Sequence, residues 1–485
     1  MSAEDETLSF GIEASTGRPL NTLTDDVIRQ MLGGETAGVL DLALKARNDE
    51  LSAGGRAYGL APGEEIVDPN DLSISGWGIL FGPNVSQKIK DALAPLIERR
   101  KQECGALFKV FDADGVRKDE TVYDWLKRRK VSLNPVVPDA GVPYYLLIVA
   151  SPQDVSFEFQ YSLDLYWACG RLWFDTAEEF RRYAESVVKY ETDAKPPTTR
   201  QLALFAPEHD FDNPTQLFTR QVAEPLCGRQ TTKPALGAAL KYKLREFLGA
   251  NATKDNLANI LRGKIDGGKP ALLFSGGHGM QFDNGHPDQL DTQGALVCQD
   301  WAGYGAITDD HWFAAKHVPA DANVHGLMHF MFACHGGGVP RLDNFDRLNN
   351  APREIAPRAF FSKLPQALLA HKNGGALAVL AHMERAWAYG FQGDGGFPQI
   401  QGFRGVLAGL LRGDRIGQAT DTFNVGWAAV GTRLTEAQED LKRDATLPVA
   451  PIRKLWIQRD DARNFMVFGD PAVRLRQQEM PPLAQ

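Results

Sequence analysis

The sequence predicts an α/β fold in which a mostly parallel β-sheet is covered by helices on both faces. Short, nearly continuous apolar runs recur along the chain, at 144–151, 200–207, 270–277, 326–337 and 374–382. Stretches such as "TAEEFRRYAESVVKYE" and "LGAALKYKLREFLG" lie between several of these runs and are expected to be amphipathic helices. Apolar strands that alternate with such helices are typical of a parallel sheet buried on both faces.

The length of 485 residues exceeds that of a typical single domain, so more than one domain is expected. Residues 1–140 are interpreted as a smaller α/β N-terminal domain with a regulatory or recruitment role. Within it, 25–47 and 85–103 have helical spacing and "DLSISGWGILF" alternates like a strand. The proline-rich "SLNPVVPDAGVP" is typical of a linker. The main domain then covers 141–476, and 477–485 form a C-terminal tail.

Composition and charge limit the classes of partner. A net charge of −8 without a long basic block argues against nucleic acid. No run approaches the roughly 20 apolar residues that cross a bilayer, and the acidic N-terminus has no apolar signal-peptide core. The five cysteines are scattered and form no CxxC pair, which favours reduced thiols and disfavours structural zinc. We therefore expect a cytoplasmic protein without a membrane segment, metal or cofactor.

Two strand ends carry the residues best suited to chemistry. His278 follows an apolar strand in "LLFSGGHGMQF", and Cys334 ends the next strong strand in "FMFACHGGG". In parallel sheets, reactive groups gather where the carboxyl ends of strands meet. The chain between the two leaves room for a loop, a helix and a return to the neighbouring strand. We therefore expect His278 and Cys334 to face each other across one crevice.

A cysteine and a histidine so placed form a nucleophilic site. A thiol is a poor nucleophile at neutral pH until a base takes its proton, and an imidazole can take and return that proton. The glycines allow backbone amides to approach a substrate carbonyl, so the N–H groups of Gly279 and Cys334 are candidates for an oxyanion hole. The pattern predicts a cysteine hydrolase or an acyl-transfer enzyme.

Simpler interpretations stay open beside this one. Cys334 alone would be a buried thiol, and His278 alone would cap a turn. A metal site at His325 and His329 is disfavoured, because residues four apart in a strand lie roughly 13 Å apart and no carboxylate completes the ligand set. "HGGG" resembles a lipase motif, but the only later serine, Ser362, lacks a glycine frame. The glycine-rich stretches also lack P-loop spacing.

The order of strand–His–Gly followed by strand–Ala–Cys–x–Gly resembles that of caspase-like peptidases of clan CD. Residues 143–476 resemble in particular the gingipain-like and CHAT-type branch, on the pieces "PYYLLIVASPQDVSFEFQYSLD", "GRLWFDTAEEFRRYAESVV", "LLFSGGHGMQF", "GALVCQDWAGYG", "FMFACHGGGVP", "ALAVLAHMERAWAYGF" and "NFMVFGDPAVRLR". The resemblance implies a caspase-like three-layer α/β/α fold, a Cys–His dyad and cleavage after one preferred residue type. Caspases usually carry Arg, Gln or Gly where this chain has His335, so aspartate specificity is not carried over.

The resemblance also places substrate-binding residues on two stretches at the same sheet edge. Asp300 and Glu384 would pair with a basic P1 side chain, since a carboxylate selects its opposite charge. Trp301 and Trp387 would stack on the stem of that side chain. An internal salt bridge, for instance between Glu384 and Arg385, explains either carboxylate equally well.

The segment 336–361 is expected to be a long exposed loop after the nucleophile. If the enzyme prefers arginine, the loop offers self-cleavage sites at Arg341, Arg347, Arg353 and Arg358. The first hypothesis is a cysteine endopeptidase that needs activation and cleaves one protein partner. By resemblance, that partner would be encoded nearby, as a defence effector or pore-forming protein. The alternatives are a catalytically silent scaffold or signal-binding protein and a cysteine acyltransferase that uses the same dyad.

Overall fold

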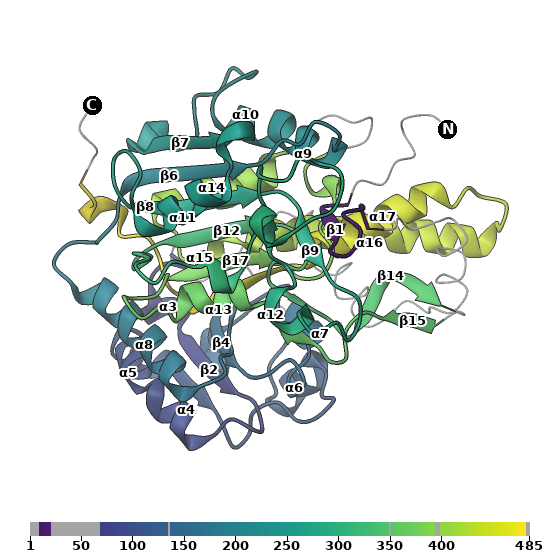
Figure 1. The fold of residues 1–485 in the computed structure, drawn as a ribbon. Helices are drawn as coiled ribbons and strands as arrows, with labels where there is room; N and C mark the ends of the chain where they lie inside the picture. The colour runs from purple at the N-terminus through teal and green to yellow at the C-terminus, as the bar shows by residue number, and fades with distance from the viewer. Residues whose placement is uncertain (1–8, 21–67, 134–135, 349–350, 393–397, 482–485) are drawn as a thin grey trace.

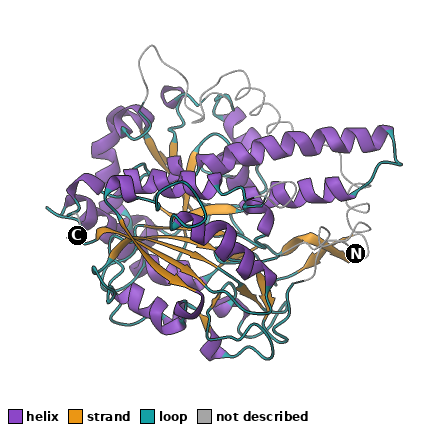
Figure 2. Ribbon diagram, turned by 90° about the horizontal axis from the view of Figure 1, so that it is seen from above, coloured by secondary structure: helices purple, strands orange, loops and turns teal. Residues whose placement is uncertain are grey.

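The computed structural model describes residues 9–20, 68–133, 136–348, 351–392 and 398–481. A ten-stranded sheet forms its core, with helices on both faces (Figures 1 and 2). The predicted α/β fold with a mostly parallel sheet is therefore confirmed. Across the sheet the strands follow the order β3 (Phe108–Phe111), β2 (Trp77–Phe81), β4 (Tyr145–Val149), β5 (Ala168–Leu172), β18 (Phe465–Gly469), β17 (Ala378–His382), β12 (Met328–Phe332), β8 (Pro270–Gly276), β6 (Thr199–Ala206) and β7 (Lys243–Leu248).

The central sheet consists of two parallel halves that run in opposite directions. Strands β3, β2, β4, β5 and β18 are mutually parallel, and so are β17, β12, β8, β6 and β7. The halves meet at the antiparallel pair of β17 and β18. As a result, the carboxyl ends of β6, β8, β12 and β17 lie along one edge of the sheet, where functional groups of parallel sheets collect.

The register of β8 and β12 brings the two candidate catalytic segments together. Phe332 pairs with Gly276, so the strands end side by side. Both strands are buried along their whole length, which explains their unbroken apolar sequence. The residues that follow, His278 and Cys334, therefore leave the sheet at neighbouring points.

Two expected elements differ from the structure. The stretch 236–249, expected as a helix, holds the edge strand β7, which pairs with β6. The sequence "KLREFL" suits an edge strand because its side chains are only partly buried there. In the expected strand 71–81, a short helix, α3 (Leu72–Ser75), is capped by the Asp71 carboxylate and precedes β2. The expected helix at 25–47 lies outside the described residues.

Strands on both sides of residue 140 belong to the same sheet. β2 pairs with β4 from Trp77–Tyr145 to Phe81–Val149 and carries β3 on its other edge. The described part of the expected N-terminal unit therefore extends the central sheet, together with α4 (Gln87–Ala92), α5 (Ala94–Cys104) and α6 (Val122–Arg128).

The remaining major helices cover the sheet or project from it. Those closest to the sheet include α7 (Phe157–Asp164), α8 (Ala177–Thr192), α9 (Asn213–Phe218), α11 (Lys254–Arg262), α13 (Lys363–Leu369) and α14 (Gln401–Arg412). The long pair α16 (Asp421–Arg443) and α17 (Ala450–Arg463) extends to one side, as both views show. Within the described ranges, no helix has the length and apolar character to cross a membrane.

A smaller four-stranded sheet lies beside the reactive edge. Its order is β1 (Gly11–Glu13), β9 (Gly279–Gln281), β10 (Leu296–Val297) and β11 (Trp312–Phe313). β9 directly follows His278, and β1 comes from the N-terminal end of the described chain. The first described residues are thus built into the neighbourhood of the candidate site (Figure 1).

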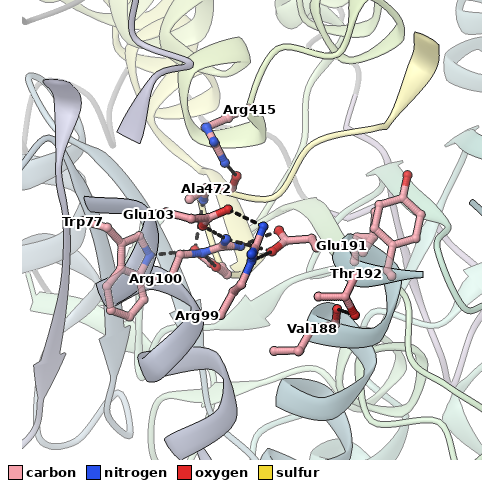
Figure 3. Close-up of polar contacts among 12 residues, drawn as sticks. Trp77, Arg99, Arg100, Glu103, Val188, Glu191, Thr192, Arg415 and Ala472 are labelled. Carbon is pink, nitrogen blue, oxygen red and sulfur yellow. Dashed lines mark hydrogen bonds and ion pairs between the residues drawn. The ribbon is translucent and has the colours of Figure 1, made fainter. Parts of the chain in front are cut away.

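A buried ion network joins the N-terminal strands to the rest of the sheet (Figure 3). Arg100 of α5 is fully buried; its Nε lies 2.7 Å from Asp470 Oδ2, and its Nη2 lies 2.6 Å from Glu191 Oε1. Trp77 Nε1 donates to the other Asp470 oxygen at 2.8 Å. Burial alone would lower the pKa of Arg100, but Asp470 and Glu191 raise it overall. The guanidinium therefore stays charged and links α5, α8, β2 and the end of β18.

We expect Arg100→Met to lower the free energy of unfolding by about 3–5 kcal/mol, because it leaves the Asp470 carboxylate buried without its cation. Urea unfolding followed by circular dichroism measures the loss. Arg99→Met is the matched control: this neighbour also contacts Glu191, but its side chain is 31% exposed, so a loss below about 1 kcal/mol is expected. Equal losses in the two variants would contradict a structural role for the buried network.

Candidate active site

Cys334 lies in a closed environment at the end of β12. Its side chain is buried, and Sγ lies 3.0 Å from the backbone N of Ala386 and 3.7 Å from Ser9 Oγ. Burial raises the pKa of the thiol to about 12, although the contacts with Ala386 and Ser9 lower it in part. The next residue, His335, has a positive φ of 57°, a conformation that is uncommon outside glycine and is often found at functional sites.

His278 is held by a carboxylate from a third strand end. Its Nε2 lies 2.8 Å from Oδ2 of Asp212, which caps the N-terminus of α9 just after β6. The Asp212 carboxylate also accepts the N–H and hydroxyl of Thr215 at 3.0 and 2.6 Å. Burial alone would raise the pKa of Asp212, but His278 and Thr215 hold it well below its ordinary value. A buried, charged carboxylate can therefore fix the orientation of the imidazole.

The backbones that follow the two strands are in direct contact. A Cβ atom on Gly279 would overlap the carbonyl of Cys334, so only glycine allows the approach. The structure thus brings the backbone segments of His278 and Cys334 into contact. It also aligns the backbone N–H groups of Gly279 and Cys334 toward one point.

That point is occupied by a carbonyl of the same chain. The oxygen of Phe10 accepts hydrogen bonds from N of Gly279 at 3.0 Å and N of Cys334 at 3.2 Å. The N–H of Phe10 donates to the carbonyl of Ala386 at 2.8 Å, and Ser9 forms an antiparallel bridge with Trp387. Beyond Phe10, β1 pairs in parallel with β9. Residues 9–13, called here the cleft segment, therefore cross the site as an extended peptide.

A turn holds the cleft segment in this position. Leu20 N–H donates to the Gly11 carbonyl at 3.0 Å, and Glu13 N–H donates to Arg18 O at 2.9 Å. The Glu13 carboxylate in turn accepts the backbone N–H of Ser15 at 2.9 Å. A Cβ on Gly11 would lie 3.0 Å from Cys334 Sγ, so the thiol sits against the backbone just after Phe10.

The four expected substrate-binding residues are spread over different surroundings. Asp300 is exposed and accepts Lys254 N–H at 2.7 Å, while Trp301 packs its ring on His209. Glu384 is buried, and burial with a neighbouring carboxylate raises its pKa above the ordinary value. Trp387 contacts the cleft segment through its backbone bridge to Ser9.

The two carboxylates expected to bind a basic residue have other partners. Both oxygens of Glu384 accept hydrogen bonds from Asn344, at 2.8 Å from its backbone N and 2.7 Å from Nδ2. Arg385 pairs with Asp343 at 2.5 Å, so an internal salt bridge of this region uses Asp343.

The segment 336–361 is not the long loop expected from its sequence. It forms β13 (Gly338–Val339), which pairs with β16 (Phe360–Phe361), and the hairpin of β14 (Leu342–Leu348) and β15 (Ala351–Glu354). The loop prediction was wrong because backbone ladder bonds form despite the polar composition. The arginines expected as cleavage sites lie around this hairpin: Arg341 pairs with Glu354, Arg353 lies in β15, Arg358 is exposed before β16, and the side chain of Arg347 lies outside the described residues.

Sequence reasoning missed Asp212 and the cleft segment. A signal for Asp212 was present, because "EHDFDNPT" follows the apolar strand 200–207 and places an acidic helix cap at the same sheet edge as His278. No comparable signal marks residues 9–13, whose partners lie hundreds of positions away. For metal ions, the described ranges contain no group of three or more His, Cys, Asp and Glu side chains placed as ligands.

We expect Asp212→Asn to lower kcat by roughly 10- to 100-fold with little change in KM, because the imidazole loses the charge that orients it but the substrate contacts remain. Steady-state hydrolysis of a peptide substrate checks this in a Phe10→Ala background, in which the cleft segment is held less firmly. Asp212→Glu should restore part of the rate, and Asp210→Asn, an exposed aspartate two residues away, is the matched control. An unchanged kcat in Asp212→Asn would contradict the orienting role.

The model of the family described as peptidase family C25 matches residues 136–476. Among solved structures, the chain is similar to the crystal structure of the Arg specific cysteine proteinase gingipain R (RGPB), with 13% identity, a TM-score of 0.49, and coverage of 86% of this chain and 80% of that chain. It is also similar to the complex of Porphyromonas gingivalis RgpB pro- and mature domains, with 14% identity, a TM-score of 0.43, and coverage of 83% and 80%. No curated protein matches the sequence.

Proposed function

Because this chain belongs to peptidase family C25, the gingipain family of caspase-like cysteine endopeptidases, we propose that it cleaves a protein substrate with Cys334 as nucleophile and His278 as general base. The resemblance to the gingipain-like branch is confirmed by the same match. One observation carries the assignment of residues: a peptide carbonyl, that of Phe10, already accepts hydrogen bonds from both Gly279 N and Cys334 N beside the thiol.

The chemistry follows from these positions. His278 takes the thiol proton, and Sγ of Cys334 attacks the carbonyl carbon of the scissile peptide bond. The oxygen becomes negative in the tetrahedral intermediate, where the N–H groups of Gly279 and Cys334 stabilise it; one such donor typically contributes about 3–4 kcal/mol. The C–N bond then breaks as His278 returns the proton to the leaving amine. Water hydrolyses the resulting thioester, which releases the carboxylic acid and the free thiol.

Activation is part of the proposal. The cleft segment fills the site from Ser9 to Glu13, so another peptide can enter only after this segment leaves. While the segment is bound, burial also keeps the pKa of Cys334 near 12, and the neutral thiol is unreactive. Displacement of residues 9–13 would therefore open the cleft and ease thiolate formation together.

We also propose that the enzyme acts in the cytoplasm. The cysteines are all unpaired, which supports a reducing compartment such as the cytoplasm. A protein encoded nearby, such as a defence effector or a pore-forming protein, remains the candidate substrate on the resemblance alone.

Alkylation by iodoacetamide tests the nucleophile in full-length Phe10→Ala, in which the cleft segment loses its main apolar contact. We expect Cys334 to react at least about tenfold faster than Cys104, a second buried thiol whose pKa is also raised to about 12. Peptide mapping measures both rates. Equal rates at the two cysteines would contradict the assignment and favour a silent scaffold. In a separate assay with a peptide substrate and an added amine, transfer of the acyl group to the amine in place of water would identify an acyltransferase.

A further inference from the structure

The side chain of Phe10 fills a pocket made of aromatic rings. Phe10 is fully buried, and its ring centroid lies 5.0 Å from Phe332, 5.8 Å from Phe391 and 6.0 Å from Phe218. The three contacts are all edge-to-face, with interplanar angles of 72°, 64° and 72° for Phe218, Phe332 and Phe391, the geometry that aromatic quadrupoles favour. These three phenylalanines are called here the aromatic pocket. The centroid of the His278 imidazole lies 5.9 Å from that of the Phe10 ring.

The pocket is rigid because its walls pack on one another. Phe218 and Phe332 are stacked at 5.5 Å with an interplanar angle of 11°, and Phe391 contacts both rings edge-on. Phe218 is the last residue of α9, the helix whose N-terminal cap is Asp212. Phe332 is the last residue of β12. The same elements that position the catalytic groups therefore build the pocket.

The backbone of Phe10 identifies this pocket as the primary specificity site. Its carbonyl accepts from the two amides of Gly279 and Cys334, its N–H donates to Ala386, and the following residue lies against Sγ of Cys334. In a cysteine peptidase, the residue whose carbonyl is bound in this way supplies the side chain immediately before the scissile bond. Phe10 thus stands in the P1 position, and the bond from Phe10 to Gly11 stands where a substrate bond would be cut.

The carboxylates near Phe10 are largely engaged by other groups, and only Oδ2 of the buried Asp461 has no hydrogen-bond partner among the described residues. Asp212 is already engaged by His278 and Thr215. The buried Asp461 accepts Trp387 N–H at 2.8 Å, and its Oδ1 lies 3.1 Å from His382 Nε2. A guanidinium placed among the three rings would lose its hydration, a cost that a phenylalanine side chain does not carry.

Resting on the proposed function, we infer that the enzyme selects a large aromatic side chain at P1. The substrate class is therefore a peptide or unfolded protein segment with phenylalanine, or a ring of similar size, before the cut bond. This replaces the basic P1 residue expected from Asp300 and Glu384, whose carboxylates are bound by Lys254 and Asn344.

The test uses two acyloxymethyl ketone probes that are identical except for phenylalanine or arginine at P1, with iodoacetamide as a reagent that has no P1 side chain. Full-length Phe10→Ala is treated with each, and labelling of Cys334 is followed by peptide mapping. We expect the phenylalanine probe to label Cys334 at least tenfold faster than the arginine probe. Tyr123→Ala, which removes an exposed ring far along the chain, should label at the wild-type rate.

The other outcomes separate the two claims. If the arginine probe labels Cys334 as fast as the phenylalanine probe or faster, aromatic selection is overturned but the assignment of Cys334 as nucleophile stands. The same conclusion holds if iodoacetamide labels Cys334 and neither probe does. If no reagent labels Cys334, the proposed function fails and the inference fails with it. Should Phe10→Ala not fold, Phe10→Arg gives an independent measurement. If the pocket selects aromatic side chains, it rejects the introduced arginine, and iodoacetamide labels Cys334 of Phe10→Arg faster than Cys334 of wild type. If the pocket selects basic side chains, the labelling rate of Phe10→Arg stays at or below that of wild type.

Discussion

Cys334→Ala is expected to lower peptidase activity by at least about a thousandfold in a Phe10→Ala background, because the proposed mechanism forms the thioester on the Cys334 sulfur. Residual hydrolysis would come from water attack on a substrate carbonyl that the backbone N–H groups of Gly279 and Cys334 still bind. Release of fluorescence from labelled, unfolded casein measures the rate, and mass spectrometry of the products identifies the new termini. Loss of this size exceeds anything that a local packing change at a cysteine produces.

The matched control for this prediction is Cys104→Ala in the same background. Cys104 is a buried thiol at the end of α5, and its pKa is raised to about 12, as is that of Cys334. Cys104 ends the helix that packs on β2 and β3, at the far end of the sheet from β8 and β12. Its loss should therefore leave the rate within about twofold. Activity that survives in Cys334→Ala would show that another residue performs the chemistry.

Phe10→Arg is expected to raise the casein-cleaving activity of the full chain by roughly 100-fold over wild type. The substitution removes a fully buried ring, a change that typically costs about 3–5 kcal/mol, and places a charge among three phenylalanines. A shift of about 3 kcal/mol in the docking of the cleft segment corresponds to roughly a hundredfold change in the open population. Initial rates at pH 7.5 with equal protein concentrations check the result.

The pH dependence of wild type and Phe10→Arg supplies a second readout. With the segment docked, the pKa of Cys334 is raised from 9.0 to about 12, so the docked state favours the neutral thiol. The contribution of the neutral thiol to the docked state, relative to the open state, is fully present below pH 9. It is lost as the pH rises from 9 toward 12. Wild-type activity should therefore rise more steeply than that of Phe10→Arg between pH 8 and 10. Parallel profiles, or unchanged activity in Phe10→Arg, would contradict a segment that blocks the site.

Local sequence determined the parts of the fold whose signals are local. The buried strands β4, β6, β8, β12 and β17 were predicted because strands covered on both faces must be apolar along their whole length. His278 and Cys334 were selected from the sequence because each lies within two residues of the end of such a strand and close to glycines. β7 was wrongly predicted as a helix, since its half-exposed pattern fits either element and its pairing with β6 decides between them.

Tertiary structure alone decided what enters the site. The partners of Phe10 come from five separate places in the sequence, at 218, 278–279, 332–334, 386 and 391, and no spacing rule joins residue 10 to any of them. The carboxylates of Asp300 and Glu384 looked available in the sequence, yet Lys254 and Asn344 occupy them in the fold. The physical reason is the same in each case: strand character and glycine conformation are set within a few residues, whereas pocket lining and ion pairing depend on which distant segments the sheet order brings together.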